Sequence, residues 1–424
     1  MLRPGLRYGV PRGSPNKGDA MQPADFIENE RVHFTLQKLQ SACGDKVFSD
    51  IVDGEGHQYV DLVMEGGGVL GIALVGYTYA LERMGLRFLR VGGTSAGSIN
   101  AMLMAALDKP SAPKSERVLA LLAGKNLYDF VDGDGDARDF VEALVEGAGK
   151  FKLALKGAQV LDTLQDKLGI NPGRAFLAWL RDVLDRAGVS STEQLRARLC
   201  DLPADLRVRG GRKLTARELA PKVAIVSADV STETKVEFPY MAPLYWSDPD
   251  GVHPATYVRA SMSIPFFFEP FRVDKPPRGV KAMDAWKELA GYEDRIPSAC
   301  LFVDGGIMSN FPIDLFHRAG RVPRAPTFGA KLGSDHRSSR EIEGPFELAG
   351  AMFNAARHCL DYDFIKRNPD YNLLVSWIPT GEHNWINFNL SDAAKVDLFA
   401  SGVETAAQFL RDFDWAAYKK MRAA

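Results

Sequence analysis

The sequence has no excess of either charge and no hydrophobic run long enough to cross a membrane. Its 424 residues include 52 Lys and Arg against 54 Asp and Glu, which gives a formal net charge of −2. Nucleic-acid-binding proteins usually carry a basic excess, so the overall charge does not indicate such a partner. The longest uncharged stretches, 66–81 and 91–107, are shorter than the roughly 20 apolar residues that a membrane-spanning helix needs.

Cysteine is also scarce. The chain contains four cysteines, which form no CxxC pair: Cys43, Cys200, Cys300 and Cys359. Four isolated cysteines in a chain of this length do not indicate a disulfide framework or a clustered metal site. We therefore expect free thiols and a reducing, cytoplasmic location.

The chain does contain alternating strand-like and helix-like segments with glycine turns between them. Residues 59–64 form a short apolar run that ends at a glycine triplet, and residues 72–84 have helical character up to Gly85. A second strand-like run at 88–91 leads through another glycine turn into an apolar helix at 99–107. This order is typical of a parallel α/β sheet.

The rest of the chain extends this pattern. Further strands are expected at 222–228, 234–238 and 300–303. Residues 391–412 have the spacing of an amphipathic helix, and the segment at about 109–221 is predicted to be a mostly helical insert. We predict a three-layer α/β/α sandwich with a mainly parallel central sheet, a helical insertion and a C-terminal helix, as a single domain over 21–424. Residues 1–20 have three Pro, four Gly and no apolar segment of a signal peptide, which predicts a disordered extension.

The clearest chemical signal is the sequence Gly-Thr-Ser-Ala-Gly at 93–97. G-x-S-x-G between a strand and a helix is typical of a nucleophile elbow, a tight turn that exposes its serine. Gly93 and Gly97 leave room for that turn. Ser95 would lie at the N-terminus of the next helix, where backbone N–H groups favour developing negative charge. The alternative is a glycine-rich turn that a serine caps.

A glycine triplet follows the first expected strand. Gly66, Gly67 and Gly68, with Gly71 after them, present backbone N–H groups that no side chain shields. Acyl transfer needs such donors, because the attacked carbonyl oxygen becomes an oxyanion. The alternative is a nucleotide loop, since the triplet and Gly71 match the bare G-x-G-x-x-G pattern. No G-K-[ST] follows, which excludes a Walker loop.

A third signal is Asp304, which stands directly after an expected strand and before Gly305 and Gly306. A carboxylate at a strand end beside two glycines can approach other strand ends closely. It can then orient a serine hydroxyl or accept its proton. The alternative is a turn or helix-cap residue.

Together, these motifs resemble those of the patatin-like phospholipase family. The resemblance covers about residues 58–412. It rests on four segments: 64–71 (MEGGGVLG), 93–98 (GTSAGS), 259–268 (RASMSIPFFF) and 303–312 (VDGGIMSNFP). It implies an enzyme that hydrolyses acyl esters of lipids with a Ser–Asp dyad in place of a triad.

The resemblance also implies roles for individual residues. Ser95 would be the nucleophile and Asp304 its partner. The backbone N–H groups of Gly66, Gly67 and Gly68 would line the oxyanion hole. The supporting glycines of the three motifs would be Gly71, Gly93, Gly97, Gly305 and Gly306.

Other candidate sites have less support. Alternating aspartates at 132–136 suggest a calcium loop, but Ala137 and Ala143 occupy the positions of its Gly and Glu. No histidine pair has the spacing of a zinc site, so we expect neither a metal nor another cofactor. A Ser–Asp–His order stays open, because four histidines follow Asp304: His317, His336, His358 and His383.

Two functions remain open from the sequence. The first is a serine hydrolase that cleaves carboxylic esters of membrane phospholipids, of the phospholipase A or lysophospholipase type, through an acyl-enzyme. The second is a catalytically weak lipid-binding or regulatory protein on the same scaffold. Many family members carry Arg or Lys where this chain has Leu70, which keeps the second function open. The intact pair of Ser95 and Asp304 favours the enzyme.

A lipid hydrolase without a membrane-spanning helix needs a peripheral surface that contacts the membrane. Two segments are candidates for this contact. Residues 150–156 mix basic and apolar residues, and residues 272–287 form a Pro-containing loop with several basic residues. Basic side chains near an anionic membrane contribute roughly 1 kcal/mol each, screened by salt. The first segment is favoured, because its apolar residues can insert into the interface. The alternative for both is an ordinary solvated face.

Overall fold

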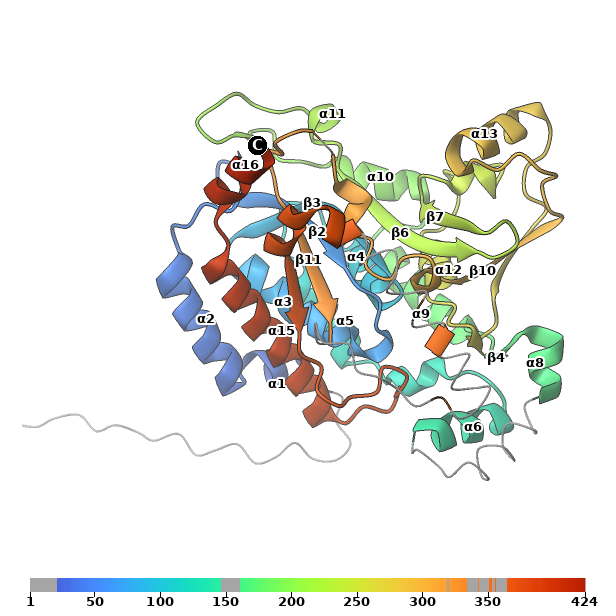
Figure 1. Ribbon diagram of the computed structural model, residues 1–424. Coiled ribbons are helices and arrows are strands. Elements are labelled where there is room, and N and C mark those ends of the chain that lie inside the picture. Colours follow the sequence, from blue (N-terminus) through green and yellow to red (C-terminus); the bar gives the residue numbers. More distant parts are fainter. Residues whose placement is uncertain are drawn as a thin grey trace, which may run out of the picture.

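The structure is a computed structural model that describes residues 21–145, 161–318, 320–333, 342, 351–352, 355 and 364–423. The extension expected at 1–20 and the membrane contact expected at 150–156 lie outside the described residues. His336 and His358 lie outside them as well. In Figure 1 the strands occupy the middle of the molecule and helices lie on both sides.

A mixed sheet forms this centre, with strands in the order β12-β11-β2-β3-β6-β10-β9. The strands of this order are β2 (Gln58–Met64), β3 (Leu86–Thr94), β6 (Lys222–Asp229), β9 (Phe271–Asp274), β10 (Ala299–Asp304), β11 (Thr327–Leu332) and β12 (Val375–Ile378). Neighbours from β12 to β6 pair in parallel, whereas β10 is antiparallel to both β6 and β9. Shorter strands extend the sheet: β1 (Ile51–Val52), β5 (Arg207–Val208) and β7 (Thr234–Phe238).

The core contains the helices predicted at 72–84, 99–107 and 391–412 together with further helices. They are α1 (Pro23–Ile27), α2 (Glu30–Cys43), α3 (Ile72–Arg83), α4 (Ala96–Ala106), α12 (Ala255–Ser261), α13 (Val280–Ala290), α15 (Asp392–Asp412) and α16 (Trp415–Ala423). The predicted sandwich with a mainly parallel central sheet and a C-terminal helix is confirmed. The sequence did not reveal β11 and β12, which complete the parallel part of the sheet, or the antiparallel direction of β10.

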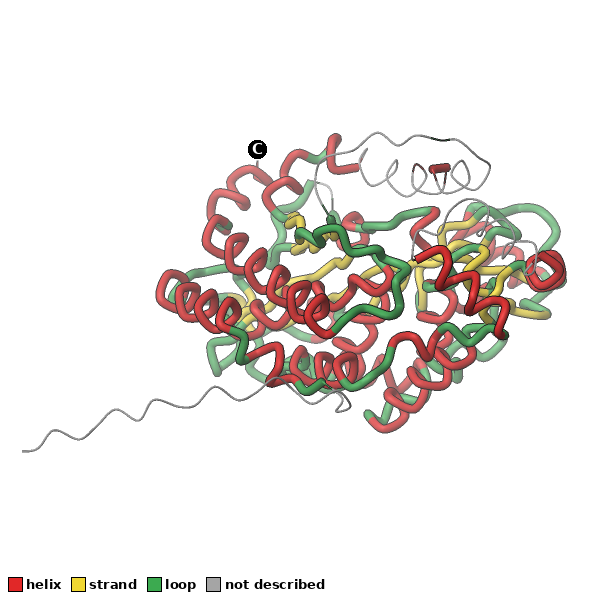
Figure 2. Tube along the Cα trace, turned by 90° about the horizontal axis from the view of Figure 1, so that it is seen from below, coloured by secondary structure: helices red, strands yellow, loops and turns green. Residues whose placement is uncertain are grey.

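Two adjacent glycines in β3 show what covers each face of the sheet. Neighbouring residues of a strand point to opposite faces. A Cβ on Gly93 would lie 2.5 Å from the carbonyl carbon of Gly97 in α4, and a Cβ on Gly92 would lie 2.7 Å from Leu315. One face therefore carries α4, and the other carries the 3₁₀ turn Ile313–Phe316. In Figure 2 the strands (yellow) lie among the helices (red).

The layer with α4 also contains α3, and the C-terminal helix α15 crosses α3 at very short distance. A Cβ on Gly76 of α3 would lie 2.0 Å from the Phe399 carbonyl oxygen, and a Cβ on Gly402 of α15 would lie 2.0 Å from the Ala73 carbonyl oxygen. Only glycine fits at both positions. The close crossing places the start of α15 beside the residues that follow β2 and β3.

The segment expected as an insert, 109–221, contains α5 (Ser115–Ala123), α6 (Gly135–Val145), α8 (Leu161–Lys167), α9 (Arg174–Arg186), α10 (Thr192–Cys200) and α11 (Ala216–Leu219). It also contains two short strands. β5 pairs with β1, and β4 (Gly169–Asn171) pairs in parallel with β8 (Phe266–Phe268). Helices α5, α9 and α10 pack against α3, α12 and α4, respectively. These three helices of the segment therefore contact helices of the core.

Candidate active site

Ser95 forms a strained turn between β3 and α4. Its backbone has φ 50° and ψ −119°, a conformation that non-glycine residues rarely adopt. A Cβ on Gly97 would lie 2.2 Å from the Met64 carbonyl oxygen, and a Cβ on Gly93 would approach Gly97 as closely as described above. Both glycines are therefore required by the close approach of β2, β3 and α4, as in a nucleophile elbow.

The elbow places Ser95 at the first turn of α4. The backbone N–H groups of Ser98 and Ile99 donate to the Ser95 carbonyl oxygen at 2.9 and 3.2 Å. The Ser98 hydroxyl donates to the same oxygen at 2.6 Å. The side chain of Ser95 is 5% exposed and lines a pocket. The hydroxyl is thus held at a helix N-terminus, where negative charge is favoured.

The glycine triplet lies beside this serine. A Cβ on Gly66 would lie 2.5 Å from the Asn310 side-chain oxygen and 3.1 Å from the Ser95 Cβ, so a side chain here would displace its neighbours. The Gly66 N–H donates to the Asn310 carbonyl oxygen at 3.0 Å and is used by the fold. The N–H groups of Gly67 and Gly68 donate to no other group in the described part of the chain. Gly68, with φ +54°, begins the 3₁₀ turn Gly68–Gly71.

A buried polar network holds the triplet from behind. The Glu65 carboxylate accepts from the Asn310 side-chain amide at 3.1 Å and from the Leu332 N–H at 2.6 Å. The Lys331 ammonium lies 3.5 Å from the same carboxylate. The Asn310 amide also donates to the Gly66 carbonyl oxygen at 3.1 Å. These bonds fix the direction of the N–H groups that follow, which sequence reasoning did not foresee.

Asp304 ends β10 on the other side of β6 from Ser95. Thr94 aligns with Val226 and Asp304 aligns with Ser227, so Ser95 and Asp304 lie level across β6. Two strand spacings of about 4.8 Å separate their backbones. The Asp304 carboxylate is 3% exposed and accepts from the Gly306 N–H at 2.7 Å.

The glycine after Asp304 is also required by a close approach. A Cβ on Gly305 would lie 2.2 Å from the Val226 carbonyl oxygen. The chain can therefore turn directly away from β6 after Asp304, as the Asp-Gly-Gly pattern suggests.

The last residue of α12 and the segment that follows hold both candidate catalytic residues by their backbones. The Ser261 hydroxyl accepts from the Ser95 N–H at 3.0 Å and donates to the Val226 carbonyl oxygen at 2.6 Å. Two residues later, the Ser263 carbonyl oxygen accepts from the Asp304 N–H at 2.7 Å. This segment is part of the family resemblance, but its sequence alone does not reveal this bridging role.

Arg259 anchors the bridging segment to the insert. Its guanidinium donates to the Ser263 hydroxyl and, at 2.8 Å each, to the carbonyl oxygens of Pro172 and Glu269. Burial lowers the pKa of Arg259 to about 10, so it remains charged at neutral pH. A buried cation with these partners fixes the loop rigidly, because an unpaired charge would be costly there.

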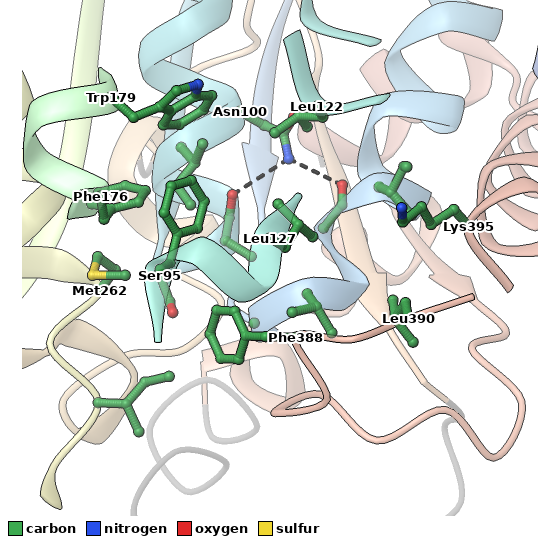
Figure 3. A pocket seen from close by; sticks show the side chains of 18 residues that line it. Ser95, Asn100, Leu122, Leu127, Phe176, Trp179, Met262, Phe388, Leu390 and Lys395 are labelled. Carbon is green, nitrogen blue, oxygen red and sulfur yellow. Dashed lines mark hydrogen bonds between the residues drawn. The ribbon is translucent and has the colours of Figure 1, made fainter. Parts of the chain in front are cut away.

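The pocket beside Ser95 is almost entirely apolar. Residues from α4, α5, α9, the segment after α12 and the segment before α15 line it, as Figure 3 shows. Its side chains include Leu122, Leu127, Phe176, Trp179, Met262, Phe388 and Leu390. Besides Ser95, the polar side chains of the lining are Asn100 and Lys395, whose ammonium pairs with Asp392 at 3.2 Å. The Asn100 amide donates to the carbonyl oxygens of Gly71 and Ala96.

The other candidate sites have different surroundings. The Asp132 carboxylate accepts from the backbone N–H groups of Gly173 and Ala175, so it organises a turn. Within the described residues, no group of three or more His, Cys, Asp or Glu has the arrangement of a metal site. The His317 ring contacts Tyr371, and His383 lies 3.8 Å from Asp397, and neither lines the pocket of Ser95.

We expect Ser261→Ala to lower kcat for a soluble ester about 10- to 100-fold, with little change in KM. Without the Ser261 hydroxyl, the buried Ser95 N–H loses its acceptor, which destabilises the active conformation of the turn by about 1–3 kcal/mol. The Ser95 side chain is then positioned less well for attack. Ser49→Ala is the matched control, because the buried Ser49 hydroxyl also donates to a strand carbonyl oxygen, that of Tyr59. Equal losses of stability with a normal kcat in both variants would refute the positioning role.

This chain is similar to known proteins in sequence. A family model described as Patatin-like phospholipase matches residues 62–317. The Uncharacterized protein YqhO of Bacillus subtilis (strain 168) is 29% identical over 359 residues, 84% of this chain and 100% of that protein.

Solved structures to which this chain is similar include VipD from Legionella pneumophila. It shares 17% identity at a TM-score of 0.40, over 88% of this chain and 72% of that one. The ExoU–SpcU complex from the type III secretion system of Pseudomonas aeruginosa matches at 17% identity and a TM-score of 0.34. That match covers 97% of this chain and 61% of the other chain.

Proposed function

We propose, from the premise that this chain belongs to the patatin-like phospholipase family, that it cleaves carboxylic esters of membrane phospholipids through a Ser–Asp dyad. Membership supports lipid hydrolase activity in general. The observation that carries the finer proposal is the strained elbow of Ser95, which opens into an apolar pocket beside the N–H groups of Gly67 and Gly68.

The proposed reaction proceeds in two halves. Ser95 Oγ attacks the ester carbonyl carbon while its proton passes to the Asp304 carboxylate. The N–H groups of Gly67 and Gly68 stabilise the oxyanion. The bond to the alcohol breaks, and the alcohol leaves with the proton from Asp304. A water molecule then gives a proton to Asp304 and attacks the acyl-enzyme carbonyl carbon. The bond to Ser95 Oγ breaks, the fatty acid leaves, and Ser95 Oγ takes the proton back from Asp304, which restores both residues.

The shape of the pocket suits an acyl chain but leaves little free space. Its free volume is about 70 Å³. This is less than half of the roughly 150 Å³ cavity that binds benzene in an engineered protein. A long acyl chain therefore requires apolar side chains of the pocket, such as Trp179 from the insert, to move aside. Short acyl chains should fit with less rearrangement.

Membrane contact is proposed at an apolar pair next to this pocket. None of the described helices has the length and apolarity to cross a membrane. Phe266 is 65% exposed and Leu168 is 49% exposed. Phe266 pairs with Gly169, the residue after Leu168, and Ile264 nearby lines the pocket. Exposed apolar side chains at this place can insert into a lipid interface.

The segment at 272–287 gives weaker support for a membrane contact. The Arg272 guanidinium pairs with Asp274 at 2.8 Å and the Lys287 ammonium pairs with Glu293 at 3.0 Å. These pairs reduce the positive charge available to an anionic membrane.

Vesicles of a phosphatidylcholine with different chains at sn-1 and sn-2 test the proposal. Wild-type protein should release a fatty acid that mass spectrometry identifies, and Ser95→Ala protein should not. Phe266→Ser should slow vesicle hydrolysis several-fold and leave hydrolysis of a soluble ester unchanged, because only the former needs the interface. Vesicle binding without release of fatty acid by wild-type protein would favour the lipid-binding alternative.

A further inference from the structure

A second cavity lies toward the N-terminal ends of the parallel strands, whereas Ser95 lies at their C-terminal ends. Asp61 and Arg90 line it, and they align with Thr327 and Lys222, the first residues of β11 and β6. Ser95 follows Arg90 by five positions along β3, a distance of about 16 Å at 3.3 Å per residue. The free volume of this cavity is about 400 Å³, so it is much larger than the pocket of Ser95.

The side chains of this cavity carry an excess of positive charge. Five arginines line it: Arg90, Arg318, Arg321, Arg324 and Arg422. Two carboxylates also line it, and both are paired. Asp61 lies 3.0 Å from Arg90, and Glu218 pairs with Arg212. The chain as a whole has a net charge of −2, so the excess here is a local arrangement and not a result of composition.

Arg422 of α16 binds the backbone of the segment that carries Arg318, Arg321 and Arg324, here called the arginine loop. Its guanidinium donates to the carbonyl oxygens of Arg318 and Arg321 at 2.7 and 3.0 Å. It also pairs with Asp370 at 2.9 Å. The two bonds to the arginine loop involve only its backbone carbonyl oxygens. The side chains of Arg318 and Arg321 remain available to bind a ligand. Arg422 of α16 thereby holds two residues that line the cavity.

Three arginines of the loop have no anionic partner in the described part of the chain. The guanidinium groups of Arg318, Arg321 and Arg324 donate to no carboxylate, carbonyl or hydroxyl there, and all three residues are exposed. Guanidinium groups bind phosphate oxygens in a bidentate manner. Several of them around one cavity suit an anion with several charges.

Two titratable residues that line this cavity, His317 and Asp61, have shifted pKa values. Burial and then the charge of Arg422 lower the pKa of His317, whose ring nitrogen lies 2.8 Å from the Tyr371 hydroxyl. Burial raises the pKa of Asp61 to about 6, although Arg90 opposes the shift. The raised pKa of Asp61 therefore reduces the negative charge that would oppose an anion at weakly acidic pH, and the lowered pKa of His317 means that the positive charge of the cavity comes from its arginines.

We propose that this cavity binds a compact anion with two or more phosphate groups, separately from the hydrolytic site. The soluble form of this chemistry is a polyphosphate or a multiply phosphorylated metabolite. The lipid form is a head group with a pyrophosphate. Both forms present closely spaced phosphates to the arginines of the loop.

Calorimetric titration with inorganic tripolyphosphate tests the proposal. Wild-type protein should bind it at low salt, and the double variant Arg318→Gln/Arg321→Gln should bind at least about tenfold more weakly, because charge-assisted hydrogen bonds are lost. The matched control is Arg278→Gln/Arg295→Gln, which removes two exposed guanidinium groups near α13 and should bind as wild type. Hydrolysis of a soluble ester should be normal in both variants, which also shows that they are folded.

Vesicles that contain diacylglycerol pyrophosphate distinguish the two sources. Vesicle binding that tripolyphosphate displaces would assign the cavity to a lipid head group. Tripolyphosphate binding without vesicle binding would assign it to a soluble anion. The proposal is overturned if wild-type protein binds neither probe, or if the α13 control loses as much affinity as the loop variant. Either result leaves the hydrolytic assignment untouched, because ester hydrolysis is measured independently.

Discussion

Ser95→Ala should lower kcat for a short-chain nitrophenyl ester by about 10⁵- to 10⁶-fold, which is the usual effect of removing a serine nucleophile. The strained elbow presents the Ser95 hydroxyl in the pocket, and the described structure offers no second serine in the same turn geometry. An organophosphonate should label Ser95 covalently, because it accepts the same attack as the ester. Mass spectrometry of the labelled peptide locates the modified residue.

The matched control for this result is Ser49→Ala. The Ser49 hydroxyl is fully buried, donates to the Tyr59 carbonyl oxygen at 2.5 Å and accepts from the Ile51 N–H at 3.1 Å, so its loss removes internal hydrogen bonds outside the elbow. This variant should keep both the label and most of the activity. Labelling that persists in Ser95→Ala protein would show that another residue is the nucleophile.

Asp304→Asn should lower kcat by about 10²- to 10⁴-fold, which is the range for loss of a general base. Asparagine has nearly the same size, and its side-chain oxygen can still accept from the Gly306 N–H, so the fold should persist. Circular dichroism checks the fold, and single-turnover kinetics with the nitrophenyl ester checks the acylation step.

A buried aspartate on the neighbouring strand provides the control. The Asp229 carboxylate accepts from the Ser231 N–H and the hydroxyls of Thr232 and Tyr245, and it is fully buried. Asp229→Asn should lower stability and leave kcat near the wild-type value. Its loss of activity to the same degree would mean that Asp304→Asn acts through stability alone.

Single alanine variants of the four later histidines complete this test: His317, His336, His358 and His383. If Asp304 is the base, all four should retain near-wild-type rates. Loss of activity in one of them, with an active Asp304→Asn variant, would support a triad in place of the dyad. His317 lines the arginine-lined cavity, which lies at the other ends of the strands from Ser95. The variant of His317 should therefore affect anion binding more than hydrolysis.

The sequence alone predicts those parts of the protein that depend on neighbouring residues. A strand, a tight turn and a helix are close in the chain, so the elbow at Ser95 and the turn at Gly66–68 leave a local pattern of glycines. The same holds for the alternation of strands and helices that predicts a mainly parallel sheet. The antiparallel direction of β10 leaves no such pattern, because its partners β6 and β9 determine it.

Only the tertiary structure decides which distant residues support the site. The Ser261 hydroxyl lies 166 positions from the Ser95 N–H that it accepts from, and Asn310 lies 245 positions from Glu65. A serine or an asparagine has the same side chain whether it faces solvent or a strand end. The sequence around it therefore does not reveal its hydrogen-bond partner. The arginine-lined cavity likewise combines β3, the loop after Phe316 and α16. Its charge excess depends on packing these segments around one space, which composition and local periodicity cannot specify.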